Sequence, residues 1–189
     1  MLQNINDSAK RLQRIFENYI FYANLEVAAS NASEIKLMQS KKIMLAEYLL
    51  RDITMYMAGN AGRTDDIQLD LEDANIKISE TFFTKMLEEI IDNAFKFSDR
   101  SQPVKIQSAV VDDFYAISVT DFGRGMTREQ IENVDAHIQF ERTIYEQQGL
   151  GLGLAIAKKV ATLHNGEFII KSEVGVSTTV TIKLPIAPD

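Results

Sequence analysis

Residues 83–97 carry an apolar repeat that fits one face of a helix. The apolar positions fall three and four residues apart, the spacing of a buried helical stripe: Phe83, Met86, Leu87, Ile90, Ile91, Ala94 and Phe97. Ser79 precedes the repeat and suits the N-cap position, because its hydroxyl can accept a hydrogen bond from an orphan N–H of the first turn. We therefore expect a helix over about residues 80–97, with one face in a core.

Three polar residues of this helix form a line beside the apolar face. At roughly 100° per residue, Glu89, Asn93 and Lys96 fall within about 60° of one another. From the helix alone, the simpler interpretation is a solvated edge stabilised by roughly a few tenths of a kcal/mol of local pairing. The alternative is a row of side chains that looks into a cleft, and the rest of the chain favours it.

Five of the nine glycines lie in two short stretches. The first stretch follows residues 113–121, whose β-branched and aromatic content predicts a strand that ends in Asp121, just before Gly123 and Gly125. Such a corner suits a nucleobase, because a carboxylate can accept a hydrogen bond from an exocyclic amine and glycine permits flat, close contact.

The second glycine stretch opens a helix expected over about residues 150–164. It contains Gly149, Gly151 and Gly153, and backbone N–H groups at a helix N-terminus bind anions with the help of the helix dipole. Two better-known phosphate motifs are excluded. The nucleotide P-loop needs a Gly-Lys pair that the chain lacks, and the dinucleotide fingerprint needs an apolar strand where residues 145–148 are polar.

Four motifs in order now resemble those of a known family. Residues 89–98, residues 121–125, Phe140 and residues 149–154 resemble the N, G1, F and G2 boxes of sensor histidine kinase ATP-binding domains. These domains belong to the superfamily of gyrase, heat-shock chaperones, histidine kinases and mismatch-repair proteins. The tail is similar too, with a closing helix before residues 163–167 and a hairpin around residues 175–185. The resemblance covers roughly residues 34–186.

The resemblance implies roles for the line of polar residues. Asn93 would ligate Mg²⁺, which keeps several waters and needs only one or two protein oxygens. Lys96 would act as a point charge on the phosphates, and Glu89 occupies the position of the superfamily's water-activating base. Because phosphoryl transfer depends mainly on positioning and charge neutralisation, Glu89 is expected to matter less than Asn93.

The other boxes imply a nucleotide site with a lid. Asp121 would hold the adenine amine with help from Thr179, and Gly123 and Gly125 would admit the purine. The segment 126–150 would be an ATP lid that carries Phe140 and Arg142. The phosphates would be wrapped by the G2 box, which consists of Gly149, Leu150, Gly151, Leu152 and Gly153. Leu150 replaces a Ser or Thr common in relatives, and Ser177 replaces a frequent glycine, which puts nucleotide affinity in question more than identity.

The N-terminal segment has a different pattern. A seam with alternating spacings of three and four runs through Leu2, Ile5, Ala9, Leu12, Phe16, Tyr19 and Ala23. It is typical of a helical bundle or coiled coil, and the alternative is an amphipathic helix packed on its own domain. In histidine kinases the phosphoacceptor domain is a helical hairpin that dimerises, and residues 6–26 resemble its second helix.

The acceptor histidine expected on the first helix of that hairpin is missing. His137 falls in the expected lid, and His164 is interpreted as a helix C-terminal residue favoured by the dipole. We therefore divide the chain into the second helix of a truncated dimerisation domain (1–27), a linker (28–33) and an ATP-binding catalytic domain (34–189).

The element pattern predicts an α+β fold in which helices cover a mixed, mostly antiparallel sheet, a two-layer sandwich. Short strands are expected at Ile35 and Leu37, over 67–71, 103–110 and 113–121, and in a final hairpin of 167–173 and 178–184. A further helix is expected from Ile43 to Met57, with Met44, Leu45, Tyr48, Leu49 and Ile53 turned inward. The resemblance implies the Bergerat-type ATP-binding fold.

Composition limits the partners. A net charge of −7 argues against a nucleic-acid partner, whose binding surface would be basic, and against contact with an anionic membrane. The absence of cysteine excludes disulfides and thiolate metal sites and suits a cytoplasmic setting. No apolar run approaches the length of a membrane helix.

These observations predict the ATP-binding catalytic domain of a two-component sensor histidine kinase. It would bind Mg-ATP and donate the γ-phosphate to a histidine on the phosphoacceptor helix of the same or the sister protomer. A response-regulator receiver domain would be the next partner, and the full-length protein would be a homodimer. The alternatives are a nucleotide-gated binding module without transfer, and another ATPase or a serine kinase of the superfamily.

Overall fold

The computed structural model describes residues 2–136 and 152–188. Five strands form one sheet in the order β1-β2-β3-β5-β4. Their bounds are β1 Ile67–Leu71, β2 Val104–Val111, β3 Phe114–Asp121, β4 Glu167–Glu173 and β5 Ser177–Pro185. Within these described ranges, only the β1–β2 pairing is parallel. The sheet is therefore mixed and mostly antiparallel, as the element pattern predicts.

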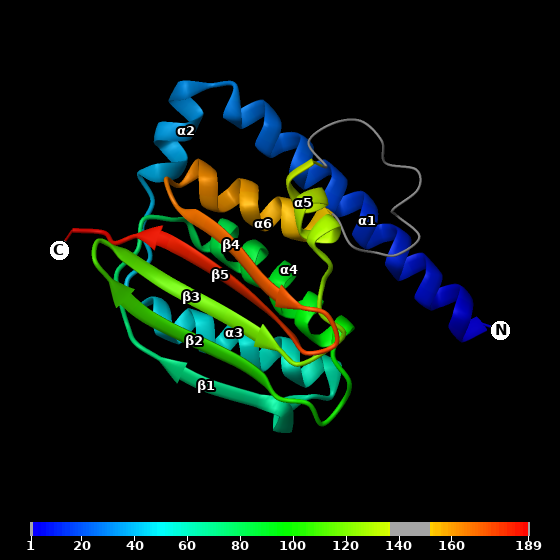
Figure 1. The fold of residues 1–189 in the computed structure, drawn as a ribbon. Helices are drawn as coiled ribbons and strands as arrows, with labels where there is room; N and C mark the ends of the chain where they lie inside the picture. Colours follow the sequence, from blue (N-terminus) through cyan, green and yellow to red (C-terminus); the bar gives the residue numbers. More distant parts are fainter. Residues whose placement is uncertain (1, 137–151, 189) are drawn as a thin grey trace.

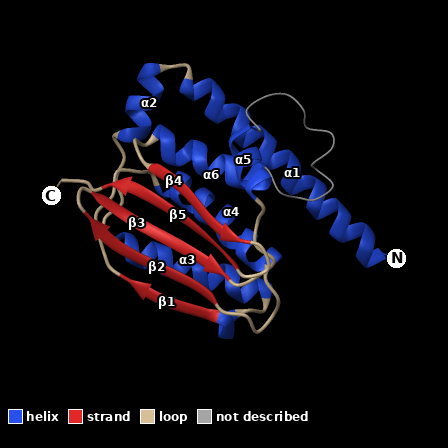
Figure 2. Ribbon diagram, in the orientation of Figure 1, coloured by secondary structure: helices blue, strands red, loops and turns tan. Residues whose placement is uncertain are grey.

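Three helices cover one face of this sheet (Figures 1 and 2). They are α3 Ala46–Ala61, α4 Glu80–Phe97 and α6 Leu152–Leu163, while α5 Arg128–Ala136 follows the turn after β3. The core lies between helices and sheet, where alternate residues of β3 and β5 meet the apolar stripe of α4. The predicted α+β fold with a sheet layer and a helix layer is confirmed.

Helix α4 forms as its sequence indicates. It begins after Ser79, whose hydroxyl accepts a hydrogen bond from the N–H of Phe82. Six of the seven apolar stripe residues are buried, and Phe97, at the end of the helix, is half-buried. Helix α5 likewise begins with a capping box, in which the side chains of Thr127 and Gln130 each accept a hydrogen bond from the other's backbone N–H.

Helix α1 (Leu2–Ala29) packs against α6 and contacts α4 through side chains, and it adds residues to the edge of this core. Its inward face buries Asn18, Tyr22 and Leu25. The predicted seam lies on a different face, and its described large members are exposed: Ile5, Leu12, Phe16 and Tyr19. The helix therefore packs on its own domain through another face, and the seam is not the surface that does so.

The short strand predicted at Ile35 and Leu37 is wrong. Residues Ala32–Gln39 form helix α2, which begins after Asn31, whose side-chain oxygen accepts a hydrogen bond from the N–H of Ser33. Only Ser30 and Asn31 separate α2 from α1, so most of the predicted linker is helical. A single capping residue outweighed the weak strand pattern.

The predicted face of α3 is also wrong in part. Met44, Leu45 and Tyr48 are exposed, whereas Ala46 and Leu50 are buried. The helix begins only at Ala46, after Leu45 with a left-handed φ of 56°. The buried side consists of Ala46, Leu50, Ile53, Thr54 and Ala58. Tertiary packing therefore decided which residues of this helix became buried.

The histidine at the end of α6 is buried rather than charged and exposed. His164 is 1 % exposed, its Nδ1 lies 2.8 Å from the carbonyl oxygen of Val160, and its ring lies 5.4 Å from that of Phe82. Burial lowers the pKa of His164, so its helix-end position is confirmed but the dipole argument for a charged ring is wrong.

Candidate functional site

A small pocket lies where α4, β3, β5 and the start of α6 meet. Three of its polar residues come from three elements, Asn93 from α4, Asp121 from the end of β3 and Thr178 from β5, and Arg124 from the turn after β3 is the fourth. The remaining wall is mostly apolar, with Ile90, Ala94, Phe97, Val119, Met126, Leu154 and Val180. The pocket therefore combines an apolar slot with few convergent polar groups, which is the usual character of a ligand site.

Asp121 is the buried carboxylate of this pocket. It is 6 % exposed, and its Oδ1 accepts a hydrogen bond of 3.0 Å from the N–H of Gly123. Burial raises the pKa of Asp121 to about 6, against the opposing effects of that hydrogen bond and of the Arg63 charge. An acceptor held in an apolar wall can select a ligand with an N–H donor at that point.

The two glycines after Asp121 have a packing role. A side chain at Gly123 would collide with the backbone of Phe97 and Ser98, and one at Gly125 with the backbone of Glu173 and Val174. Gly125 also has a φ of +67° and lines the pocket. Close packing within the protein therefore explains why both positions are glycine, and their contact with a purine stays a prediction.

The strand register changes the expected threonine. Thr178 pairs with Asp121 across β3 and β5, is buried and lines the pocket. Thr179 is on the opposite side of β5, where its hydroxyl lies 2.9 Å from that of Thr120. The expectation for Thr179 is therefore corrected to Thr178, because neighbouring residues of a strand face opposite sides of the sheet.

Glu89 is enclosed by cations. It is 2 % exposed, its Oε1 lies 2.7 Å from the ammonium of Lys85, and its Oε2 lies 3.2 Å from the guanidinium of Arg14. The same guanidinium reaches Asp92 at 2.7 Å. Both oxygens of Glu89 are therefore occupied, an arrangement that suits a charge anchor between α1 and α4 better than a base that activates water.

Lys96 and Asn93 follow Glu89 along the edge of α4. Asn93 faces the pocket, whereas Lys96 lies next to it, with its ammonium 5.0 Å from the centroid of the Phe97 ring. The guanidinium of Arg124 also stacks on the Phe97 ring, 4.2 Å from its centroid. The pocket itself is nearly filled, with about 20 Å³ of free space. A ligand of purine size would therefore need lining side chains, such as that of Arg124, to move aside.

The described part of the G2 box touches the charge anchor. Gly153 lies so close to Glu89 that a β-carbon there would strike Oε2. Leu152 opens α6 beside it. The expectations for Phe140, Arg142, Gly149, Leu150 and Gly151 fall outside the described residues, as does His137.

The donor set fits a hard cation that keeps most of its waters. Residues 2–136 and 152–188 contain no cluster of three or more acidic, His or Cys side chains arranged around one metal. A cation such as Mg²⁺ needs only one or two protein oxygens, and the side chain of Asn93 at the pocket could supply one.

Sequence reasoning missed two residues that contact Glu89. Arg14 is 75 positions away from Glu89 in the sequence, so no local spacing indicates the pair. Lys85 lies one helical turn before Glu89, and this i,i+4 spacing was visible.

None of the helices in the described ranges has the length and apolar character needed to cross a bilayer.

The chain matches the family model of histidine kinase-, DNA gyrase B-, and HSP90-like ATPases over residues 78–188. Histidine protein kinase DivJ of Caulobacter vibrioides is 34 % identical over 51 % of this chain and 16 % of its own length. Sensor histidine kinase YvrG of Bacillus subtilis is 30 % identical over 59 % of this chain and 19 % of its own. The chain thus spans less than a quarter of these curated relatives.

The fold resembles solved histidine kinases. The structure of the Acinetobacter baumannii histidine kinase AdeS aligns with a TM-score of 0.70 at 16 % identity, over 99 % of this chain and 84 % of that one. The mycobacterial sensor histidine kinase MprB aligns with a TM-score of 0.66 at 19 % identity, over 79 % and 99 %. At these identities the likeness speaks for the fold alone.

Proposed function

Because the chain belongs to the histidine kinase-, DNA gyrase B-, and HSP90-like ATPase family, we propose that it is the ATP-binding catalytic part of a sensor histidine kinase. In this proposal the pocket between α4, β3 and β5 holds adenine, and the phosphates extend past Asn93 and Lys96. Asp121 accepts a hydrogen bond from the exocyclic amine, supported by Thr178. The convergence of Asn93, Asp121 and Thr178 from three elements on one pocket carries the proposal.

The proposed chemistry is transfer of the γ-phosphoryl group to a histidine outside this chain. An imidazole nitrogen bonds to the γ-phosphorus while the bond from the bridging oxygen breaks, and ADP leaves. Asn93 would hold Mg²⁺, which supplies charge neutralisation when bound, and Lys96 would add a second positive charge. Since both oxygens of Glu89 are bound by cations, the histidine would be activated within its own segment.

Helix α1 is proposed to be the second helix of the dimerisation domain. Its exposed seam of Ile5, Leu12, Phe16 and Tyr19 supports packing against a partner helix, in a homodimer of the full-length protein. The further proposed partners are the phosphoacceptor helix of the same or the sister protomer and a response-regulator receiver domain. The proposed setting is the cytoplasm, where ATP is available.

The test is transfer of labelled γ-phosphate from ATP to a supplied acceptor-helix hairpin. The parent chain should label the hairpin with an acid-labile phosphate, and Asn93→Ala should not. An acid-stable product would instead indicate a serine kinase of the superfamily, and free phosphate without labelling would indicate an ATPase.

A second candidate is a nucleotide-gated binding module. The observation in its favour is the pair of ion pairs from Arg14 to Glu89 and Asp92. They link α1 directly to α4, the helix that lines the proposed nucleotide pocket. ATP binding measured by calorimetry, with no labelling of any acceptor hairpin, would favour this module.

A further inference from the structure

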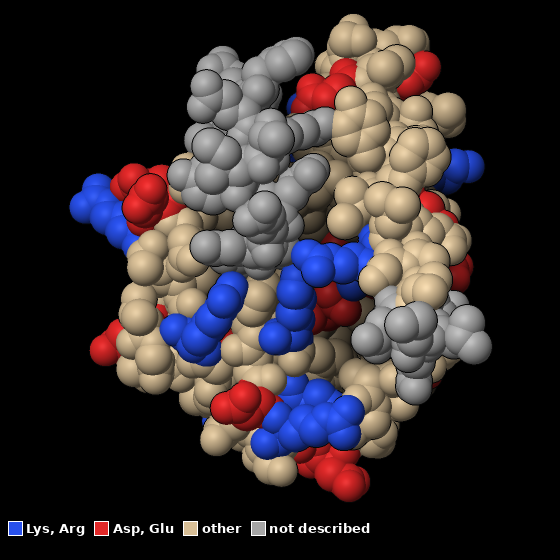
Figure 3. All heavy atoms as spheres, turned by 90° about the vertical axis from the view of Figure 1, so that its right-hand side faces the viewer, with Lys and Arg blue, Asp and Glu red and all other residues tan. Residues whose placement is uncertain are grey.

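A hollow separate from the small pocket lies between α1, the C-terminal end of α4 and the turn after α3. Its volume is about 890 Å³, within the range of small-molecule sites. Basic residues dominate its lining, with Lys10, Arg11, Arg14, Arg63, Lys96 and Arg100 against Asp92 and Asp99. Figure 3 shows basic side chains gathered on this face of the molecule, around a depression with acidic atoms deeper inside.

Several of these charges are already used by the fold. Arg14 is paired with Glu89 and Asp92, and Arg63 is buried among Asp66 and backbone carbonyls. Lys10 and Arg11 of α1 differ, because in the part of the chain that the structure describes neither has a carboxylate within ion-pair distance. Although the chain has a net charge of −7, the described residues thus leave these two cations without a neutralising carboxylate.

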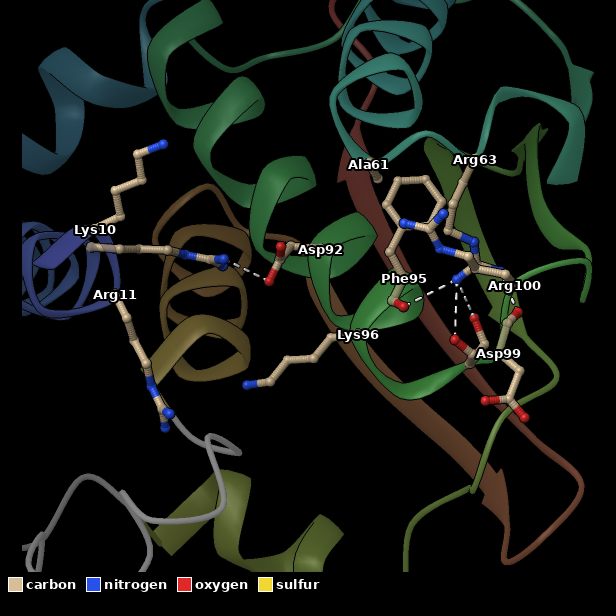
Figure 4. A pocket seen from close by; sticks show the side chains of 11 residues that line it. Lys10, Arg11, Ala61, Arg63, Asp92, Phe95, Lys96, Asp99 and Arg100 are labelled. Atoms are coloured by element: carbon tan, nitrogen blue, oxygen red, sulfur yellow. Dashed lines mark hydrogen bonds and ion pairs between the residues drawn. The ribbon is translucent and has the colours of Figure 1, made fainter. Parts of the chain in front are cut away.

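Arg11 and Lys96 extend toward one another across the hollow, from α1 and α4 respectively (Figure 4). Their charges act on each other. The loss of surrounding water lowers the pKa of Lys96, and Arg11, Arg14 and Arg124 lower it further, against the opposing effect of Asp92. Like charges held together repel, and an anion placed between them relieves the repulsion.

The hollow adjoins the small pocket along α4. Asn93 lines the pocket and Lys96 lines the hollow, three residues further along the same edge, or about 4.5 Å along the helix axis. A ligand whose base lies at Asp121 and whose charged end passes Asn93 would therefore reach the hollow. The last phosphate of a triphosphate extends further in that direction than that of a diphosphate.

We propose that Arg11 of α1, together with Lys96 of α4, binds the terminal phosphate of the bound nucleotide. Helix α1 would thereby contribute to the preference for ATP over ADP. This rests on the proposed function of the pocket. It adds a ligand contact by α1 and implies that ATP, more than ADP, favours the arrangement in which α1 is packed on α4.

The test compares ATP and ADP affinities of the full chain by calorimetry with Mg²⁺ present. Arg11→Gln should weaken ATP binding by roughly three- to ten-fold and ADP binding by less than about two-fold. Arg11→Lys, which keeps the charge, should recover most of the loss. Lys36→Gln, an exposed lysine of α2 away from the hollow, is the matched control and should leave both affinities unchanged.

Inorganic triphosphate identifies the source of the anion. It should compete with ATP for the parent chain, because one set of cations would bind both. The inference is overturned if triphosphate binds alongside saturating ATP, or if Arg11→Gln weakens ATP and ADP equally. Failure of the parent to bind any adenine nucleotide would instead overturn the proposed function of the pocket.

Discussion

At the scale of one residue, Asp121 is a site residue whose buried charge lowers the stability of the folded protein. Its carboxylate lies in an apolar wall, and one backbone N–H and a distant guanidinium only partly compensate for the lost water. A carboxyl group whose folded pKa is raised costs no stability below its ordinary pKa of 3.8, and its full cost appears above about 6. The residue that would select adenine thus destabilises the protein without ligand at neutral pH.

Asp121→Asn should therefore stabilise the chain and disable the pocket. The difference between 3.8 and about 6 corresponds to at most about 3 kcal/mol, and we expect a gain of roughly 1–2 kcal/mol at pH 7.5. Thermal unfolding should show the gain, while calorimetry should show ATP binding weakened at least about ten-fold. At pH 4 the gain should vanish, and a lower melting temperature of the variant at pH 7.5 would contradict the argument.

Arg63 is a single side chain that closes the end of a helix. It is 4 % exposed and donates to Asp66, to the Ser98 hydroxyl and to four carbonyl oxygens, those of Phe95, Ser98, Asp99 and Gln102. These carbonyls lie at or just beyond the C-terminal end of α4, where a positive charge also complements the helix dipole. Arg63 therefore holds the part of α4 that carries Asn93 and Lys96.

Arg63→Met should cost about 3–5 kcal/mol of unfolding free energy, because it leaves Asp66 and several carbonyls without their donor. Urea denaturation measures the loss. Arg128→Met is the matched control, since the Arg128–Glu132 pair is 91 % and 62 % exposed and should contribute less than about 1 kcal/mol. Equal effects of the two substitutions would show that Arg63 does not have this role.

At the scale of elements, α4 is the helix on which the other parts converge. Its apolar stripe faces the sheet, its edge residues line the pocket and the hollow, and Glu89 ties it to α1 through Arg14. Helix α6 can lie close to it because Gly153 leaves room for Glu89. The glycine predicted as a phosphate-binding residue thus also sets the contact between two helices.

Gly153→Ala should destabilise the chain by roughly 1–3 kcal/mol, because the added methyl group strikes Glu89 within a packed contact. Gly59→Ala is the matched substitution in α3, where an added β-carbon meets nothing within 4 Å. It should stabilise by up to about 1 kcal/mol. Thermal unfolding distinguishes the two, and a neutral Gly153→Ala would mean that α6 does not approach Glu89 this closely.

At the scale of the whole molecule, acid should loosen the packing of the helix layer through His164. Its ring is buried between α6 and Phe82, and Nε2 has no hydrogen-bond partner among the described residues. Because the folded pKa is below the ordinary 6.5, the unfolded chain takes up the proton first as pH falls. Stability from this group is therefore intact above about pH 6.5 and declines below it.

His164→Phe isolates this contribution. The difference in unfolding free energy between variant and parent should be constant above pH 7. It should grow in favour of the variant between pH 6.5 and 5, by at most about 1.4 kcal/mol per pH unit. Urea denaturation at each pH measures it, and the carboxyl groups common to both proteins cancel in the difference. A difference that stays flat down to pH 5 would contradict the assignment.

The sequence by itself determined the features that depend on a few neighbouring residues. The apolar stripe of α4 and its cap at Ser79 are local patterns, and each formed as predicted. The motif order was also enough to identify the family, because the motifs lie on elements with fixed roles. A local prediction still failed at α2, where the helix cap at Asn31 outweighed a weak strand pattern.

Only the tertiary structure decided the partners of those features. Strand register placed Thr178 rather than Thr179 beside Asp121, since a shift of one residue reverses the face of a side chain. Packing bound Glu89 to Arg14 from a distant helix and left the seam of α1 exposed. The spacing of residues along a chain specifies which face each element presents, whereas the neighbours that meet that face depend on how all elements pack together.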